Sequence, residues 1–323
     1  MAKQMAADLK AGDHIATFLQ IDEASVFNFQ KKPGKYAVFT FKDRSGSVKG
    51  VCWDRGEEYF SSFGDGQVVF VEGRVESYRG SIQIVVDAII DKPEGSFDPD
   101  DFLVKTTLDV EALCAYISET IGKIKNRHIR QLLELFYEDP EFADKFRRSP
   151  AAKSIHHSYL GGLAEHTANC LRLAETLCDV YPQLDRDLLY AGVLLHDSGK
   201  TVELSCEHSV DYTDQGRLLG HIVIGYTMVL DKIRQIEGFP DSKKDELLHL
   251  IISHHGENAT GSPKRPKMAE ACALHFLENL DAQTKRFLQI VEESGPGARE
   301  AKWTAYNRML ERYIYRKPVD EDQ

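Results

Sequence analysis

The chain has no apolar run long enough to span a membrane and no apolar signal-peptide core near its start. A transmembrane helix needs about 20 consecutive apolar residues, and no stretch of the 323-residue sequence approaches that length. The opening segment, residues 1–8, mixes small, polar and charged residues, unlike a cleaved secretory leader. We therefore expect a cytoplasmic protein with no membrane partner.

Cysteine pairs and excess positive charge are also missing. The six cysteines form no C-x-x-C pair, which excludes a disulfide-rich scaffold and predicts reduced, mostly buried thiols. The 40 Lys and Arg residues against 51 Asp and Glu give a net charge of −11. This charge argues against broad, non-specific coating of nucleic acid, which relies on cationic side chains. A nucleic-acid enzyme is still compatible with it, because bound divalent cations change the local sign of charge.

Two stretches of different periodicity make up most of the sequence. Residues from about 12 to 92 are typical of strands, and Gly73 divides one of the runs in two. The runs rich in β-branched and aromatic residues are 36–42, 47–53, 68–78 and 81–86. Five or so short strands in this length predict a small closed, OB-like β-barrel over residues 1–92.

A stretch rich in Pro, Gly and Asp follows the barrel, and the pattern then becomes helical. Residues 93–108 have the composition of a linker. From Leu113 onward, apolar residues recur every three or four positions, which indicates helices. We expect a multidomain protein in which an all-α domain over residues 109–315 follows the barrel and an acidic tail occupies residues 316–323.

Histidine and aspartate recur on the apolar faces of the predicted helices. The His196-Asp197 pair ends an apolar run, where an unpaired buried carboxylate would be costly. Taken alone, each inward histidine is more typical of a hydrogen-bonded core residue. Taken together, these residues predict a metal site whose candidate ligands are His166, His196, Asp197, His221, His254, His255 and Asp281.

The expected inward direction of two ligands depends on helical neighbours. Leu218 is placed on the face of His221, and Leu280 and Leu288 on the face of Asp281. Imidazole and carboxylate ligands without clustered thiolates suit Mn, Fe, Zn, Ni or Mg.

The order His, His-Asp, His, His-His, Asp resembles that of the two-metal HD-domain phosphohydrolases, over about residues 150–290. The resemblance implies one metal held by His166, His196, Asp197 and Asp281, and a second held by Asp197 as a bridge with His221, His254 and His255. Two divalent ions are thus the expected cofactors, with manganese first and Fe, Ni, Co, Zn or Mg as alternatives.

The predicted barrel before this domain makes the resemblance to a family more specific. An OB-like segment before an HD domain with the motif at residues 154–167 is similar to the YhaM-type 3′→5′ exoribonucleases, from about residue 10 to 315. The resemblance implies a hydrolase that uses a two-metal-activated water to convert single-stranded RNA, and by extension single-stranded DNA, to nucleoside 5′-monophosphates. Homo-oligomerisation is compatible with it.

Two other functions fit the same residues. The first is an HD phosphohydrolase of free nucleotides with a regulatory or oligomerising barrel. The second is a nucleic-acid-binding adaptor whose HD domain is catalytically idle, although the intact ligand set argues against it.

Three residues near the ligands are candidates for catalysis beside Asp197. In HD enzymes the lysine that matches Lys200 approaches the phosphate, where it could stabilise negative charge; the alternative is a solvated lysine beside a helix C-terminus. His156 and His157 precede the first ligand helix, and either could donate a proton or a hydrogen bond. Support of a metal ligand and simple capping are equal alternatives for both.

Aromatic and basic residues supply candidate RNA contacts. OB folds hold single strands by stacking bases on aromatic rings beside a positive groove, although strand alternation leaves most barrel aromatics in the core. Cations in the loop after His255 could guide a phosphate backbone, with a solvated loop of mixed charge as the alternative. The expected contacts are Phe39, Phe41, Trp53, Tyr78, Lys264, Arg265 and Lys267.

Overall fold

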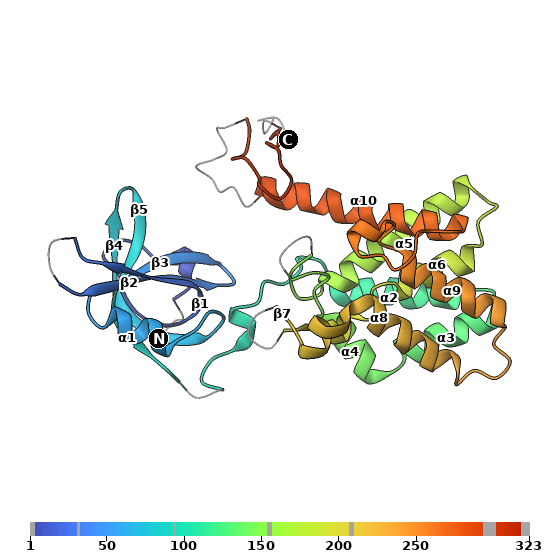
Figure 1. Cartoon of the computed structure of the whole chain (residues 1–323), viewed down its shortest axis with the longest axis horizontal. Coiled ribbons are helices and arrows are strands. Elements are labelled where there is room, and N and C mark those ends of the chain that lie inside the picture. The colour runs from blue at the N-terminus through green and yellow to red at the C-terminus, as the bar shows by residue number, and fades with distance from the viewer. Residues whose placement is uncertain are drawn as a thin grey trace. The chain divides into compact units, whose positions relative to one another are not determined.

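The computed structural model describes residues 4–30, 33–92, 95–153, 157–206, 210–292 and 302–317. The chain divides into two compact units, one of residues 1–104 with 206–210 and one of residues 105–205 with 211–323. Each unit has its own hydrophobic core. Strands make up the first unit and helices most of the second (Figure 1).

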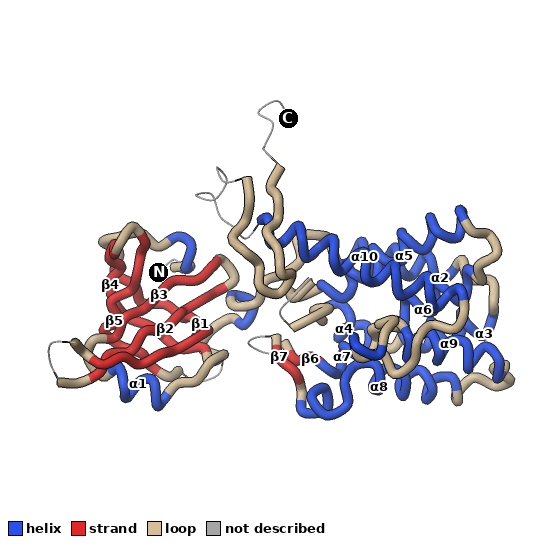
Figure 2. The backbone as a smooth tube through the Cα atoms, turned by 45° about the horizontal axis from the view of Figure 1, so that its top comes forward, coloured by secondary structure: helices blue, strands red, loops and turns tan. Residues whose placement is uncertain are grey.

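The first unit is a closed five-stranded barrel (Figure 2). Its strands pair in the order β1-β2-β3-β5-β4, and β4 returns to β1. All pairs are antiparallel except β3 with β5. The predicted barrel is confirmed, and its elements are β1 (His14–Asn28), β2 (Lys35–Asp43), β3 (Gly46–Cys52), α1 (Gly56–Ser62), β4 (Val68–Tyr78) and β5 (Ser81–Ile90), with short 3-10 turns at Ala6–Asp8 and Pro99–Asp101.

The predicted break at Gly73 is wrong. β4 runs without interruption through this residue, and its register against β5 shifts between Glu72 and Gly73. A β-bulge bends a strand without ending it, so a glycine that resembles a turn in the sequence lies inside one curved strand of the barrel.

The second unit packs helices around an apolar core that runs through most of them. Its helices are α2 (Val110–Gly122), α3 (Arg127–Tyr137), α4 (Pro140–Arg148), α5 (Gly162–Val180), α6 (Arg186–Leu195), α7 (Lys200–Glu203), α8 (Asp214–Ile233), α9 (Asp241–Ser253) and α10 (Ala269–Glu292). A 3-10 turn lies at Asn258–Thr260, and β6 (Leu204–Ser205) pairs with β7 (Asp211–Tyr212). The prediction of helices as far as residue 315 is wrong for residues 302–315, where isolated bridges join Trp303 to Tyr315 and Asn307 to Arg312.

Within the described residues, none of the helices is both long and apolar enough to cross a membrane. Cys52, Cys170 and Cys178 are buried thiols without a disulfide, whereas Cys272 is exposed.

Candidate metal centre and nucleic-acid surfaces

Asp197 lies at the centre of a group of imidazoles in the helical unit. α6 ends at Leu195, His196 caps it, and Asp197 follows in the turn before α7. The distances from the carboxylate oxygens of Asp197 to Nε2 of the four nearest imidazoles are 3.3 Å for His196, 3.6 Å for His221, 3.7 Å for His254 and 3.8 Å for His166. Four histidines distant in the sequence therefore turn the same ring nitrogen toward one carboxylate.

Hydrogen bonds on the far side of the rings fix their protonation. His196 Nδ1 donates to the carbonyl of Val193 at 2.8 Å, and His254 Nδ1 donates to the carbonyl of Ile251 at 2.7 Å. Because a carbonyl oxygen only accepts, Nδ1 carries the hydrogen in both rings, so in the neutral ring the lone pair is on Nε2.

Several of the inward-facing atoms are buried without a hydrogen-bond partner. They are His196 Nε2, Asp197 Oδ1, His221 Nε2 and His254 Nε2. Buried polar atoms that lack partners are unfavourable, and lone pairs gathered in this way are what a divalent cation requires. The residues present therefore fit bound metal.

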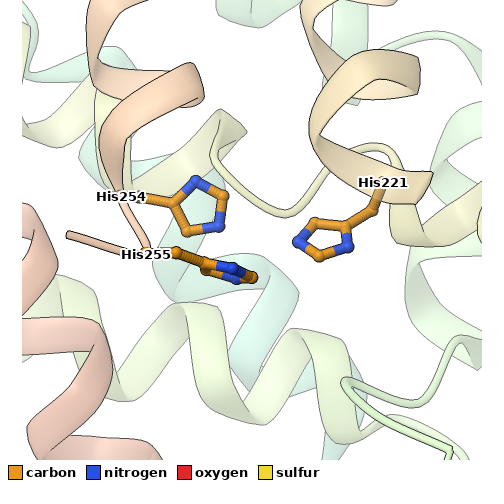
Figure 3. Close-up of side chains that lie close together, drawn as sticks. All are labelled: His221, His254 and His255. Atoms are coloured by element: carbon orange, nitrogen blue, oxygen red, sulfur yellow. The ribbon is translucent and has the colours of Figure 1, made fainter. Parts of the chain in front are cut away.

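His221, His254 and His255 form one group whose ligand atoms lie within 4.8 Å of one another, with the rings turned toward a common point (Figure 3). His255 Nδ1 donates to the carbonyl of Thr260 at 3.1 Å. His221 Nδ1 lies 3.1 Å from Glu203 Oε1, which also accepts from the His221 backbone N–H at 2.9 Å. Glu203 was not predicted, and it orients His221 in the way that carboxylates orient ligand histidines.

The prediction that Leu218 shares a buried helix face with His221 is wrong. Leu218 is 82% exposed, because α8 is kinked at Gly220, where φ is 73° and ψ is 155°. This conformation interrupts the 3.6-residue periodicity between Leu218 and His221. Leu280 and Leu288 are also exposed, so they do not extend a buried face around Asp281.

A glycine permits close packing beside Asp197. A Cβ atom on Gly199 would lie 2.1 Å from the carbonyl oxygen of His221 and 2.7 Å from the backbone nitrogen of Gly225. The absence of a side chain lets the turn that carries Asp197 pack against the backbone of α8. This contact holds His221 opposite Asp197.

His166 and Asp281 meet on the other side of the group. Asp281 Oδ2 lies 2.7 Å from His166 Nδ1 and 2.9 Å from His157 Nε2. His166 groups with His196 and Asp197 within 4.8 Å, whereas Asp281 groups with His157 and His166. The structure thus brings together the predicted ligands, with Asp281 contacting His166 rather than Asp197.

His157 is buried and occupied on both ring nitrogens. Besides Asp281, it contacts Tyr159 Oη at 3.0 Å through Nδ1, and Tyr159 in turn donates to Glu165 at 2.9 Å. This geometry favours support of a ligand over proton donation to substrate. His156 lies outside the described residues.

Lys200 stands beside Asp197 and is buried, so the alternative of a solvated lysine is wrong. Its Nζ donates to Asp197 Oδ2 at 2.7 Å. Burial alone would raise the pKa of Asp197, but Lys200 and the nearby imidazoles hold it well below its usual range. Burial lowers the pKa of His255 to about 4 and holds that of His254 well below its usual range, so both rings are neutral, as metal binding requires.

A pocket of about 310 Å³ opens onto this group and is lined by Lys200, His221, His255 and Glu278, among others. Glu278 was not predicted, although it precedes Asp281 by one helical turn, a spacing that could have revealed it. Burial and the carboxylate of Asp197 raise the pKa of Glu278 to about 7. A phosphate entering the pocket would therefore meet one buried cation and one readily protonated acid.

On the barrel, the prediction that Phe39 and Phe41 stack on bases is wrong. Phe39 and Phe41 are 0% exposed, because alternation along β2 turns both toward the barrel core. Trp53 is 43% exposed and Tyr78 55% exposed, so both can be reached by a ligand.

An aromatic cluster at one end of β1 was not predicted in full. Tyr36 contacts Phe27, Phe29 and Trp53, with ring centroids 5.5, 5.3 and 4.9 Å apart. The two phenylalanines lie two positions apart, a spacing that puts them on one face at the end of a strand. This signal was available in the sequence.

The basic loop after His255 is exposed at Lys264, Arg265 and Lys267. Arg265 is paired with Glu257 at 2.6 Å. Neither lysine forms an ion pair with the carboxylates in the described part of the chain, so both charges remain available.

Two known protein families match this chain, one in the barrel and one in the helical unit. A model of the OB-fold nucleic acid binding domain matches residues 23–91, and an HD domain model matches residues 163–283. The HD domain implies dependence on a divalent metal, for which the His and Asp groups described above are suited.

Full-length relatives share both parts. The chain is 33% identical to the 3′-5′ exoribonuclease YhaM of Bacillus licheniformis over 96% of each chain, and 34% identical to that of Bacillus subtilis over 96% of each. It is 34% identical to the protein of the same name from Geobacillus sp. (strain WCH70), over 96% of this chain and 94% of the relative. The order of domains and the identity along their whole length confirm the predicted resemblance, and the chain belongs to the YhaM 3′-5′ exoribonuclease family.

Proposed function

We propose that this protein is a metal-dependent exoribonuclease that shortens single-stranded RNA from its 3′ end and releases nucleoside 5′-monophosphates. The observation that carries the proposal is the set of buried, unpartnered lone pairs around Asp197, in a chain related along its whole length to 3′-5′ exoribonucleases. Single-stranded DNA is a second proposed substrate, because the candidate contacts recognise bases and phosphates rather than a 2′-hydroxyl.

Two divalent cations, manganese first among them, are the proposed cofactors. The first would be held by His166, His196, Asp197 and Asp281, and the second by Asp197, His221, His254 and His255. When bound, such a pair activates water and stabilises the attacking and leaving oxygens of an in-line displacement.

Residues beside the metal ligands take three roles in this proposal. Lys200 would bind a phosphate oxygen of the scissile bond from the pocket that it lines. His157 would hold the Asp281 carboxylate in place. Glu278 would face the same pocket and exchange a proton near neutral pH.

The barrel would hold the RNA strand through exposed aromatic side chains. Trp53 and Tyr78 remain proposed contacts, joined by Phe27, Phe29 and Tyr36. Lys264, Arg265 and Lys267 would contact phosphates near the metal centre. The proposed boundaries are a barrel over residues 1–92, a linker over 93–108, a catalytic domain over 109–315 and a tail over 316–323, of which residues 318–323 lie outside the described part. We also propose a cytoplasmic location and homo-oligomerisation.

The test is degradation of an RNA oligomer labelled at either its 5′ or its 3′ end, with added Mn²⁺. Stepwise shortening of the 5′-labelled strand and immediate release of the 3′ label as a mononucleotide are expected. Asp197→Asn should reduce the rate by more than the roughly 100-fold that loss of a supporting residue costs, while RNA binding is retained. Release of phosphate from free nucleotides with intact RNA would contradict the proposal.

A further inference from the structure

The segment after α10 has a composition unlike the rest of the chain. Residues 302–317 contain five Lys or Arg residues and one Glu, in a protein whose net charge is −11. The same 16 positions hold four aromatic residues, Trp303, Tyr306, Tyr313 and Tyr315. Cationic and aromatic side chains are interleaved here, a combination that binds single-stranded nucleic acid.

Backbone hydrogen bonds fold this segment back on itself. Thr304 N donates to the Ile314 carbonyl at 2.9 Å, and Asn307 N donates to the Arg312 carbonyl at 2.9 Å. Thr304, Leu310 and Ile314 are buried. The segment therefore has an inner side that packs and an outer side that presents the remaining residues, rather than the form of an extended tail; it lies beyond the C-terminal end of α10 (Figure 1).

The aromatic rings lie on the outer side and in pairs. Trp303 contacts Tyr315 and Tyr306 contacts Tyr313, each with ring centroids 5.2 Å apart. All four side chains are between 47% and 60% exposed. Leaving four large rings half in water forgoes apolar burial, and rings held by a neighbour lose little freedom when a base stacks on them.

The cations between the rings are also available. Within the described part of the chain, Lys302, Arg308 and Lys317 form no ion pair with a carboxylate, whereas many other surface cations do. Charge complementarity thus favours a polyanion over an apolar protein partner.

We propose that residues 302–317 form a second binding surface for single-stranded RNA, in addition to the barrel. Bases stack on the paired rings, and the neighbouring Lys and Arg side chains contact phosphates. The proposal rests on the proposed function for the identity of the strand. A surface of this kind retains the substrate between successive cleavages.

The test measures RNA binding and cleavage separately in the full-length protein. Binding of a fluorescent oligouridine of about 12 nucleotides is measured in EDTA, where no cleavage occurs, and degradation is then measured with Mn²⁺. The variants are Trp303→Ala with Tyr306→Ala, and Arg308→Gln with Lys317→Gln. Tyr181→Ala and the pair Lys125→Gln with Arg127→Gln serve as matched controls, since these side chains are exposed elsewhere on the helical unit.

The aromatic variant removes one ring from each pair and should bind at least about 30-fold more weakly, which is the scale of two lost base stacks. The charge variant should flatten the dependence of log Kd on log salt concentration by about 1.4, as expected for two lost contacts to a single strand. The controls should bind as the wild type does.

Wild-type affinity in both variants, while the wild-type enzyme shortens RNA, would overturn this inference and leave the proposed function intact. Unchanged RNA affinity with an altered oligomeric mass would also overturn it, by assigning the surface to contacts between proteins. A wild-type protein that neither binds nor shortens RNA would overturn both proposals.

Discussion

At the residue scale, the metal centre is defined by which atoms lack partners. A neutral histidine that donates Nδ1–H to a carbonyl keeps a lone pair at Nε2, and His196 and His254 both direct that atom toward Asp197. Their backbone partners come from one helical turn earlier in the chain, so the helix end itself sets the tautomer. The protein thereby carries ligands already in their metal-binding form.

Glu278 gives a prediction about pH. Its pKa is raised from 4.5 to about 7 by burial and by Asp197, so the folded protein binds a proton that the unfolded chain releases between these values. This contribution to stability is complete below pH 4.5 and is lost as the pH rises through 7. In EDTA, Glu278→Gln should therefore be more stable than the wild type above pH 7, by about 2 kcal/mol after partial solvent screening.

Urea denaturation of both proteins across this pH range provides the measurement. A stability difference that stays constant between pH 4.5 and 7 would show that the Glu278 pKa is not raised.

Residue types and spacing were enough to predict which side chains gather around Asp197, because a carboxylate buried among helical histidines is rarely stable without a cation. Glu203 and Glu278 were not predicted as part of the site, since single glutamates on helices are usually solvated. Phe39 and Phe41 were misassigned because two-residue alternation identifies which residues share a face but not which face is the interior.

At the scale of elements, close backbone contact positions the ligands. The turn between α6 and α7 approaches α8 so closely that a methyl group on Gly199 would overlap the backbone of His221. Gly199→Ala should lower the free energy of unfolding by about 1–3 kcal/mol and weaken metal binding, because α8 must move together with His221.

Gly122→Ala is the matched control, since a methyl group at the last residue of α2 would meet nothing within 4 Å. It should leave stability unchanged or raise it by up to about 1 kcal/mol. Chemical denaturation and metal titration of both variants check the prediction, and equal effects of the two substitutions would refute it.

Helices and strands with strong periodicity were predictable, whereas their irregularities were not. The kink at Gly220 and the bulge at Gly73 are both glycines inside elements, and a sequence pattern does not distinguish a bend from an end. The helical prediction was also wrong for residues 302–315, because the spacing of aromatic residues there does not indicate which residues they pack against.

At the scale of the whole molecule, the helical unit encloses a group of lone pairs that metal would satisfy. Only the folded state brings these atoms together, so bound metal should stabilise it. Adding Mn²⁺ to the EDTA-treated protein at about 100 times its Kd should raise the free energy of unfolding by about 2.7 kcal/mol for each site that fills.

Thermal or chemical unfolding with and without Mn²⁺ measures this effect. Asp197→Asn keeps an oxygen for Lys200 but removes the central charge, so it should show much less stabilisation. A metal-induced increase of the same size in this variant would mean that the ion binds elsewhere.

The division into a barrel and a helical unit followed from the change in periodicity and is confirmed.

The ligands lie far apart along the chain, from His166 to Asp281, and this separation has a consequence for biosynthesis. A polypeptide still emerging from the ribosome, or one cut short by a damaged message, lacks α10 and with it the last ligand. Such fragments would lack one member of the proposed ligand set, so they would not assemble the complete metal centre that we propose.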